Sequence, residues 1–177
     1  MQHLNIELKA RTTRQTEIRA WLGAQGADFR GADFQTDTYF HVPNGRLKLR
    51  TGNVENNLIH YRRADQPEAR ASEVALAPVA DGPALKNALA RALGILVEVH
   101  KRREIYFMDN VKIHLDELDG LGRFVEIEAI AQKPEHTREW LLEQCRQYAA
   151  LFRIQPDDIL AESYSDLLLR KAHNDKP

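Results

Sequence analysis

The sequence predicts an α+β protein built on an eight-stranded antiparallel β-barrel with flanking helices. Short segments that alternate apolar and polar residues follow one another along the chain, separated by turn signals, as in consecutive hairpins. Most of these segments have one apolar face and one charged face. Because strands that close into a barrel leave no exposed edges, a barrel is expected rather than an open sheet. Residues 1–177 can build one such core and are expected to form a single domain.

The first part of the chain is predicted to run strand, helix, strand. Residues 4–11 (LNIELKAR) alternate strictly, which is typical of a strand. Thr12 and Gln15 have the spacing of a helix capping box, so a helix is expected next, and Gly26 marks its end. Residues 33–42 are rich in threonine and aromatic residues, which favours a second strand.

The middle of the chain is predicted to contain hairpins and a helix. The PNG motif at 43–45 is a turn signal, and residues 46–50 (RLKLR) alternate after it, so they are expected to pair with the strand before the turn. Residues 57–63 and 72–78 are expected to form a further hairpin. A proline-initiated helix is expected over 83–93 and is followed by a glycine.

The last part of the chain is predicted to contain three strands and two helices. Residues 97–107 and 111–118 flank a tight turn, and strand structure resumes over 123–131 after a Gly-Leu-Gly break. A third helix is expected from Pro134 onward, and a short final helix over 163–171. With the earlier segments this gives about eight strands, mostly in consecutive hairpins, and helices that can cover one face of the sheet.

Composition excludes several classes of protein. The net charge of −1, from 25 basic and 26 acidic residues, argues against a nucleic-acid partner, which normally requires a basic excess. A single cysteine, Cys145, cannot form an intramolecular disulfide and favours a reducing compartment. No apolar stretch approaches the length of a membrane span or of a signal peptide. We therefore expect a soluble cytoplasmic protein with no membrane partner.

Charged side chains share one face in six of the predicted strands. For any single strand, a solvated face explains this pattern well enough. Its repetition in a chain with helices for only one side favours a charged interior, in which cations and anions must compensate one another. Removing one cation is then expected to relieve repulsion and to affect folding little. The charged sets are Glu7 and Lys9; Arg46, Lys48 and Arg50; His60 and Arg62; Lys101 and Arg103; Lys112, His114 and Asp116; and Glu126 and Glu128.

This inventory suits a metal-bound triphosphate. Lysine and arginine bind phosphate oxygens, and arginine can donate two parallel hydrogen bonds to them. Carboxylates without cysteine or paired histidine neighbours suit Mg²⁺ or Mn²⁺ rather than zinc. The chain has no P-loop and no GxGxxG motif, so side chains would have to hold the phosphates.

Taken in order, several segments resemble the CYTH superfamily, the triphosphate tunnel metalloenzymes. The family's opening motif, ExExK, corresponds to NIELK at 5–9, where Asn5 replaces the first glutamate. The resemblance extends over most of the chain and implies an eight-stranded barrel around a cationic tunnel. The other matching segments are DTYF at 37–40, GRLKLR at 45–50, the VxKxR pattern at 99–103, LDELDGLGRFVEIE at 115–128 and SYSDLL at 163–168.

The resemblance also implies roles for individual residues. Glu7, Asp116, Glu126 and Glu128 correspond to metal ligands, and Glu7 and Lys9 to catalytic groups. Triphosphate contacts are implied for Lys9, Lys48, Arg50, Arg62, Lys101 and Arg103. For Lys48, Arg62 and Asp116 an ordinary exposed charge is nearly as good an explanation, and a bulge would put Arg63 in the place of Arg62.

The family includes class IV adenylyl cyclases, thiamine triphosphatases and tripolyphosphatases. The resemblance implies an enzyme that needs Mg²⁺ or Mn²⁺ and acts on ATP, thiamine triphosphate or tripolyphosphate. A cyclase that converts ATP to cyclic AMP and pyrophosphate is slightly favoured, and a triphosphate phosphohydrolase is the alternative. Asn5 removes one acid from the metal cluster, which keeps a third alternative open: a protein that binds a phosphorylated small molecule without turnover. The oligomeric state is also open, with a homodimer among the alternatives.

Overall fold

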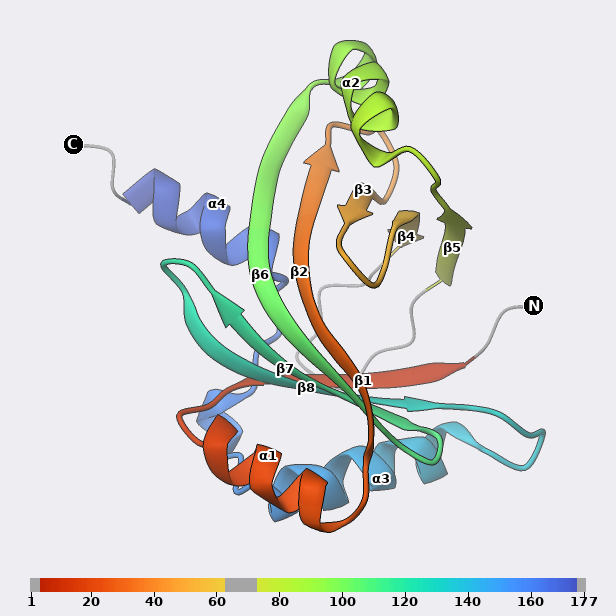
Figure 1. Cartoon of the computed structure of the whole chain (residues 1–177), viewed down its shortest axis with the longest axis vertical. Coiled ribbons are helices and arrows are strands. Elements are labelled where there is room, and N and C mark those ends of the chain that lie inside the picture. The colour runs from red at the N-terminus through yellow and green to blue at the C-terminus, as the bar shows by residue number, and fades with distance from the viewer. Residues whose placement is uncertain (1–3, 63–72, 175–177) are drawn as a thin grey trace.

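A computed structural model describes residues 4–62 and 73–174 (Figure 1). The strands are β1 (Asn5–Arg11), β2 (Asp28–Phe40), β3 (Arg46–Thr51), β4 (Asn57–Arg62), β5 (Glu73–Pro78), β6 (Ile95–Met108), β7 (Val111–Leu118) and β8 (Gly122–Ile130). The helices are α1 (Gln15–Ala24), α2 (Gly82–Leu93), α3 (Arg138–Leu151) and α4 (Tyr164–Asn174), with a short 3₁₀ turn at Pro156–Asp158.

Two predicted starts differ from the structure by more than three residues. The second strand starts at Asp28 and not at residue 33. The additional residues of β2 pair with the C-terminal part of β6, where Asp28 lies opposite Phe107. The third helix begins at Arg138 and not near Pro134, because the Thr137 side chain accepts the hydrogen bond from the Trp140 backbone N–H and caps the helix there.

The eight strands form one antiparallel sheet in the order β1-β8-β7-β6-β2-β3-β4-β5. The long strands β2 and β6 run through the whole height of the molecule and bend, so that the sheet curls (Figure 1). The strands β1, β7 and β8 lie across one end, and β3, β4 and β5 stand at the other (Figure 1). Along the described strands β1 and β5 do not pair with each other, so the predicted barrel is a curled half-barrel.

Helices α1 and α3 cover the outer face of β1, β7 and β8. Ile6, Ile113 and Ile127 are fully buried there, and Leu22 of α1 and Leu141 of α3 pack against them. Burying these apolar side chains provides most of the stabilisation expected for this half of the molecule. The strands consequently turn their other, charged face into the concave side of the sheet.

Cys145 of α3 belongs to this core. Its thiol is fully buried and lies 3.3 Å from the Ile6 carbonyl oxygen. Burial raises the pKa of the Cys145 thiol to about 11, so the side chain is a packing group.

Helices α2 and α4 pack at the other end of the molecule. Helix α2 contacts β2 and β3, and α4 places Tyr164 and Leu167 against Phe124 of β8. The outer face of β4 and β5 is less protected, with Arg62, Ala75 and Ala77 exposed. Within residues 4–62 and 73–174, no helix has the length and apolar character needed to span a membrane.

Candidate functional site

The concave side of the sheet encloses a cavity of about 510 Å³. Every strand contributes side chains to its wall, and those of β1 to β4 and β6 to β8 include polar or charged groups. The structure brings together most of the residues singled out from the sequence. Glu7, Lys9, Lys48, Arg50, Lys101, Arg103, Glu126 and Glu128 line the cavity.

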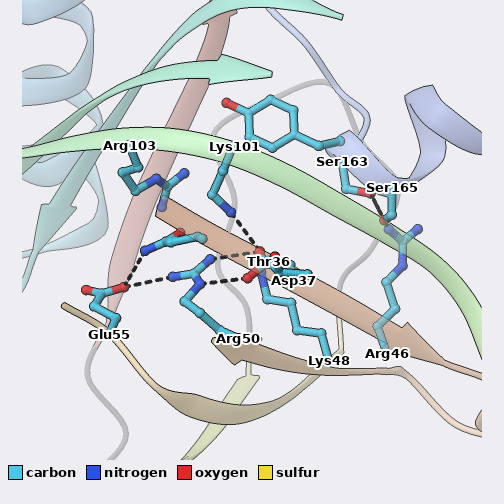
Figure 2. A network of polar contacts seen from close by, with 12 residues as sticks. Thr36, Asp37, Arg46, Lys48, Arg50, Glu55, Lys101, Arg103, Ser163 and Ser165 are labelled. Carbon is cyan, nitrogen blue, oxygen red and sulfur yellow. Dashed lines mark hydrogen bonds and ion pairs between the residues drawn. The ribbon is translucent and has the colours of Figure 1, made fainter. Parts of the chain in front are cut away.

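One wall is a cluster of cations around Asp37 of β2 (Figure 2). The Asp37 carboxylate is 1% exposed and accepts two hydrogen bonds from Arg50, at 2.8 and 3.0 Å. It also accepts from Lys101 Nζ at 2.8 Å and from Lys48 Nζ at 3.0 Å. Burial opposes its charge, but these three cations hold the pKa of Asp37 well below its usual range. Asp37 is therefore an anion that fixes the side chains of Arg50, Lys101 and Lys48 in place.

Lys101 has the most perturbed environment among these cations. Burial, with Arg50 and Arg103 nearby, lowers the pKa of Lys101 to about 7, although Asp37 partly offsets the effect. At neutral pH this amine is consequently poised between its charged and uncharged forms.

A loop between β3 and β4 brings one more acid to this wall. The Asp33 carboxylate accepts hydrogen bonds from the backbone N–H groups of residues 53–55 and so holds the loop in place. Glu55 of the loop accepts from Arg50 at 2.9 Å and from Lys112 Nζ of β7 at 3.0 Å. Burial alone would raise the pKa of Glu55, but the charges of Lys112 and Arg50 outweigh it and lower the pKa to about 2. The loop thus links β3 to β7 across the cavity.

A second cluster is built around Arg103 of β6, two residues along the strand from Lys101. Arg103 donates two hydrogen bonds to Asp116, at 2.7 and 2.5 Å, and a third to Glu126 at 2.6 Å. Tyr164 of α4 donates to Asp116 at 2.8 Å. Burial opposes the charge of Glu126, but Lys9 and Arg103 hold the pKa of Glu126 well below its usual range. These contacts orient the Arg103 guanidinium rigidly.

Strands β1 and β8 bring the remaining acids together. Their register places Glu7 opposite Glu128 and Lys9 opposite Glu126. Lys9 Nζ lies 3.3 Å from Glu7, and Asn5 Nδ2 donates to Glu128 at 2.5 Å. Burial raises the pKa of Glu7 to about 7, with a further contribution from the charge of Glu126. The result is a group of carboxyl and amide oxygens beside the Lys9 ammonium.

These oxygens fit a hard divalent cation. Among the described residues, no three histidine, cysteine or acidic side chains converge closely enough to form a complete metal site. Mg²⁺ does not require such a site, because it is commonly held by one or two carboxylates together with phosphate oxygens and water. Glu7 and Glu128 can provide such carboxylates. The Asn5 carbonyl oxygen is a further neutral donor, because its amide nitrogen already donates to Glu128.

Two of the predicted site residues lie elsewhere. Arg62 is exposed and does not line the cavity, since β4 turns Ile59 and Tyr61 inward. The cause is register: Ile59 faces the inward Lys48 across the β3–β4 pair, and directly paired residues share a face. Arg63, the alternative to Arg62, lies outside the described residues. Asp116 is fully buried behind Arg103, and its contacts are those of an anchor for that guanidinium.

Several site residues were given no role by the sequence reasoning. Asp37 lies in the DTYF segment, and Asp33, Gln35 and Asp37 occupy alternate positions of one strand. The alternation that predicted a charged face on the other strands could therefore have predicted that Asp37 faces the cavity. Lys112 and His114 share the inward face of β7. Glu55 comes from a loop, where strand periodicity gives no signal.

The cavity wall at β4 and β5 is apolar. Ile59 and Tyr61 of β4 and Val74 and Leu76 of β5 line it, and Leu76 is 57% exposed. Lys48 connects this wall to the cations, since its Nζ lies 5.9 Å from the Tyr61 ring centre. The cavity therefore has a charged half and an apolar half.

Comparison with known proteins gives three similarities that cover nearly the whole chain. A family model described as the CYTH domain matches residues 3–164. A candidate adenylate cyclase of Methanocaldococcus jannaschii is 23% identical over 175 residues, which are 93% of this chain and 98% of that protein. A Pyrococcus horikoshii protein of known structure superposes with a TM-score of 0.77 at 24% identity, covering 92% of this chain and 98% of that one.

A fourth similarity is to a Hippeastrum protein, described as a candidate adenylyl cyclase that reveals a dominant triphosphatase activity. Its structure superposes with a TM-score of 0.61 at 14% identity, and the match covers 97% of this chain and 96% of that one. At these identities the structural matches show a shared fold.

Proposed function

The chain belongs to the CYTH domain family, and on this premise we propose that it is a divalent-metal-dependent enzyme that acts on a triphosphate. One observation carries the proposal: cations and acids from separate strands line the same cavity. These cations can hold phosphate oxygens, and the acids on β1 and β8 can hold Mg²⁺ or Mn²⁺. In phosphoryl transfer a protein acts mainly by positioning the phosphate groups of the substrate and by stabilising the charge that develops on them.

We propose ATP as the preferred substrate and cyclisation as the preferred reaction. The apolar wall formed by Ile59, Val74 and Leu76 suits the organic end of a nucleoside triphosphate, whereas tripolyphosphate has no such end. Cyclisation breaks the bond between the α-phosphorus and its bridging oxygen, forms a bond to the ribose 3′-oxygen, and releases pyrophosphate. Both reacting groups belong to one molecule, so holding them in place provides much of the acceleration.

The chain's own residues divide the work in this proposal. Lys48, Arg50, Lys101 and Arg103 hold the phosphates. A cation bound at two of the carboxylates Glu7, Glu126 and Glu128, together with phosphate oxygens, would neutralise phosphate charge and polarise the reacting phosphoryl group. Glu7, with a pKa of about 7, suits removal of the hydroxyl proton, and Lys9 beside it can stabilise the resulting charge.

The second candidate is a triphosphate phosphohydrolase. The described triphosphatase activity of the Hippeastrum protein favours it, as an analogy between proteins that share a fold. A binder without turnover is the third candidate, and Asn5, in place of an acid, favours it. A buried Cys145 as the sole cysteine supports a reducing, cytoplasmic setting for any of the three.

A turnover screen separates the candidates. ATP, thiamine triphosphate and tripolyphosphate would each be incubated with the protein and Mg²⁺, then with Mn²⁺. Cyclic AMP and pyrophosphate identify a cyclase, and inorganic phosphate identifies a hydrolase. Tight binding without product identifies a binder. Absence of both binding and turnover would reject the proposed function.

Replacing Asn5 with glutamate is expected to tighten Mn²⁺ binding. The new carboxylate would lie beside Glu128, whose charge the Asn5 amide now satisfies by donating a hydrogen bond. Without metal the like charges repel, so the metal-free variant should unfold at a lower temperature than the parent. Calorimetric titration of Mn²⁺ and thermal unfolding in a chelator measure the two effects. Asn5→Gln lengthens the side chain without adding charge and serves as the control; equal or weaker affinity in Asn5→Glu would contradict the prediction.

Binding of tripolyphosphate to the metal-free protein at pH 8 is expected to take up protons at Lys101. With a pKa of about 7, this amine is mostly neutral at pH 8, and a bound polyanion favours its charged form. Titrations in buffers of different ionisation enthalpy measure the uptake. Tripolyphosphate can itself exchange protons, so the quantity to compare is the difference between the parent and Lys101→Met. An identical uptake in both would show that Lys101 does not respond to the ligand.

A further inference from the structure

His114 of β7 is a buried polar side chain without a hydrogen bond. Its ring lines the cavity, and the residue is 2% exposed. Among residues 4–62 and 73–174, neither ring nitrogen has a hydrogen-bond partner. The nearest acidic atom, Glu126 Oε2, lies 3.9 Å from Nδ1, beyond hydrogen-bond distance.

The two polar neighbours of His114 on the same face of β7 are paired. On the same face of β7, Lys112 donates to Glu55, and Asp116 accepts from Arg103. Leaving a buried polar group unpaired typically costs about 1–3 kcal/mol, so natural proteins rarely retain one without a role. Phenylalanine would fill nearly the same space without this cost. The ring of His114 therefore has no evident part in stabilising the described fold.

The surroundings of His114 indicate what it could bind. Burial, with Arg103, Lys112 and Arg50 nearby, holds the pKa of His114 well below its usual range, and Glu126 offsets this only partly. In either protonation state the ring carries at least one N–H donor. Arg50, Arg103 and Lys112 line the same cavity as His114, and phosphate oxygens are ligands that arginine and lysine bind.

We propose that His114 binds substrate directly, its ring N–H donating a hydrogen bond to an oxygen of the bound phosphate chain. The inference rests on the proposed function, because it takes the ligand of the cavity to be a triphosphate. His114 lies beside Glu126 in the β7–β8 register and between Lys112 and Asp116 along β7. It would therefore contact the phosphate chain at the point where the cations around Asp37 and Arg103 meet the acids of β1 and β8.

Metal ligation through the lone pair is the other use of a neutral imidazole. It is disfavoured because Mg²⁺ prefers oxygen ligands. The experiment below treats this use as an outcome.

The test compares tripolyphosphate binding by the parent, His114→Phe and His114→Asn in the presence of a chelator. His114→Phe keeps the ring and removes both nitrogens, so affinity is expected to fall about 10- to 100-fold, as for a lost hydrogen bond to a charged group. Its unfolding temperature should equal or exceed that of the parent. His114→Asn keeps an N–H donor and should recover part of the affinity. In the parent, tripolyphosphate should shift the ring N–H and ¹⁵N resonances of His114, a readout that needs no variant.

Three outcomes would overturn the inference. Equal affinities of the parent and His114→Phe, with unshifted ring resonances, would reject the role of His114 and leave the proposed function standing. Loss of affinity confined to Mn²⁺-loaded samples, with Mn²⁺ alone broadening the ring resonances, would make His114 a metal ligand. Failure of the parent to bind any triphosphate, with or without metal, would reject both the inference and the proposed function.

Discussion

Replacing Arg103 with methionine is expected to lower the free energy of unfolding by about 3–5 kcal/mol, as when one partner of a buried ion pair is removed. Arg103 donates three hydrogen bonds to Asp116 and Glu126, and both acids are at most 8% exposed. Methionine would leave these carboxylates buried without their cation. The alternating charges of the sequence favour the opposite result, relief of repulsion, because they do not reveal that each buried cation already has its acid.

Urea unfolding at pH 7 measures this loss. Arg123→Met is the matched control, because Arg123 makes an exposed ion pair with Glu117. Below pH 4.5 the difference between parent and variant should shrink. The pKa of Glu126 is depressed in the folded parent, so its pairing stabilises the fold above the unfolded-state pKa and is lost as pH falls through the folded-state pKa. A loss no larger than that of Arg123→Met would show that the pairing contributes little.

The second large effect is expected from Glu126→Gln, which should reduce turnover of the preferred triphosphate by about 100-fold or more. Glu126 accepts from Arg103 at 2.6 Å and lies 3.9 Å from Lys9. Glutamine keeps the shape but removes the charge that orients both cations and that is available to a metal. The variant should also need more Mn²⁺ to reach its half-maximal rate.

Steady-state rates over a range of Mn²⁺ concentrations test this. Glu117→Gln, on the outer face of β7 and 38% exposed, is the control and should match the parent. Glu128→Gln should be intermediate, because Glu128 interacts with the neutral Asn5 amide. Rates for Glu126→Gln that equal the parent at every metal concentration would remove Glu126 from the catalytic site.

Strand alternation predicted the charged interior where a helix covers the outer face. On β1, β7 and β8 the apolar residues must meet α1 and α3, so the charges turn inward. The same rule gave the wrong face for Arg62, because no such layer covers the outside of β4, and pairing with β3 decides the orientation there. The alternation of a strand thus predicts which side chains point inward only where another layer of the protein buries the opposite side of that strand.

Contacts between distant segments lay beyond the sequence. Glu55 reaches Lys112 because the β3–β4 loop folds onto the Asp33 carboxylate, and nothing in the local pattern indicates this. The pairing of Asp116 with Tyr164 likewise depends on where α4 packs. The family motifs identified strands that line the cavity. The partner of each charged side chain could be identified only from the structure.

The acids inside the cationic wall have a consequence for which anions can bind. Asp37 and Glu55 already pair with Lys48, Arg50, Lys101 and Lys112 and offset part of their charge, so a single phosphate must compete with internal counterions and gains little. A linked chain of phosphates that reaches several of these cations at once gains from multivalency, since each further contact forms at a high effective concentration. Hydrolysis or cyclisation divides the chain of phosphates, and the products no longer have this linkage. A site of this kind would favour long phosphate chains over short ones, and the reaction itself would weaken the hold on its products.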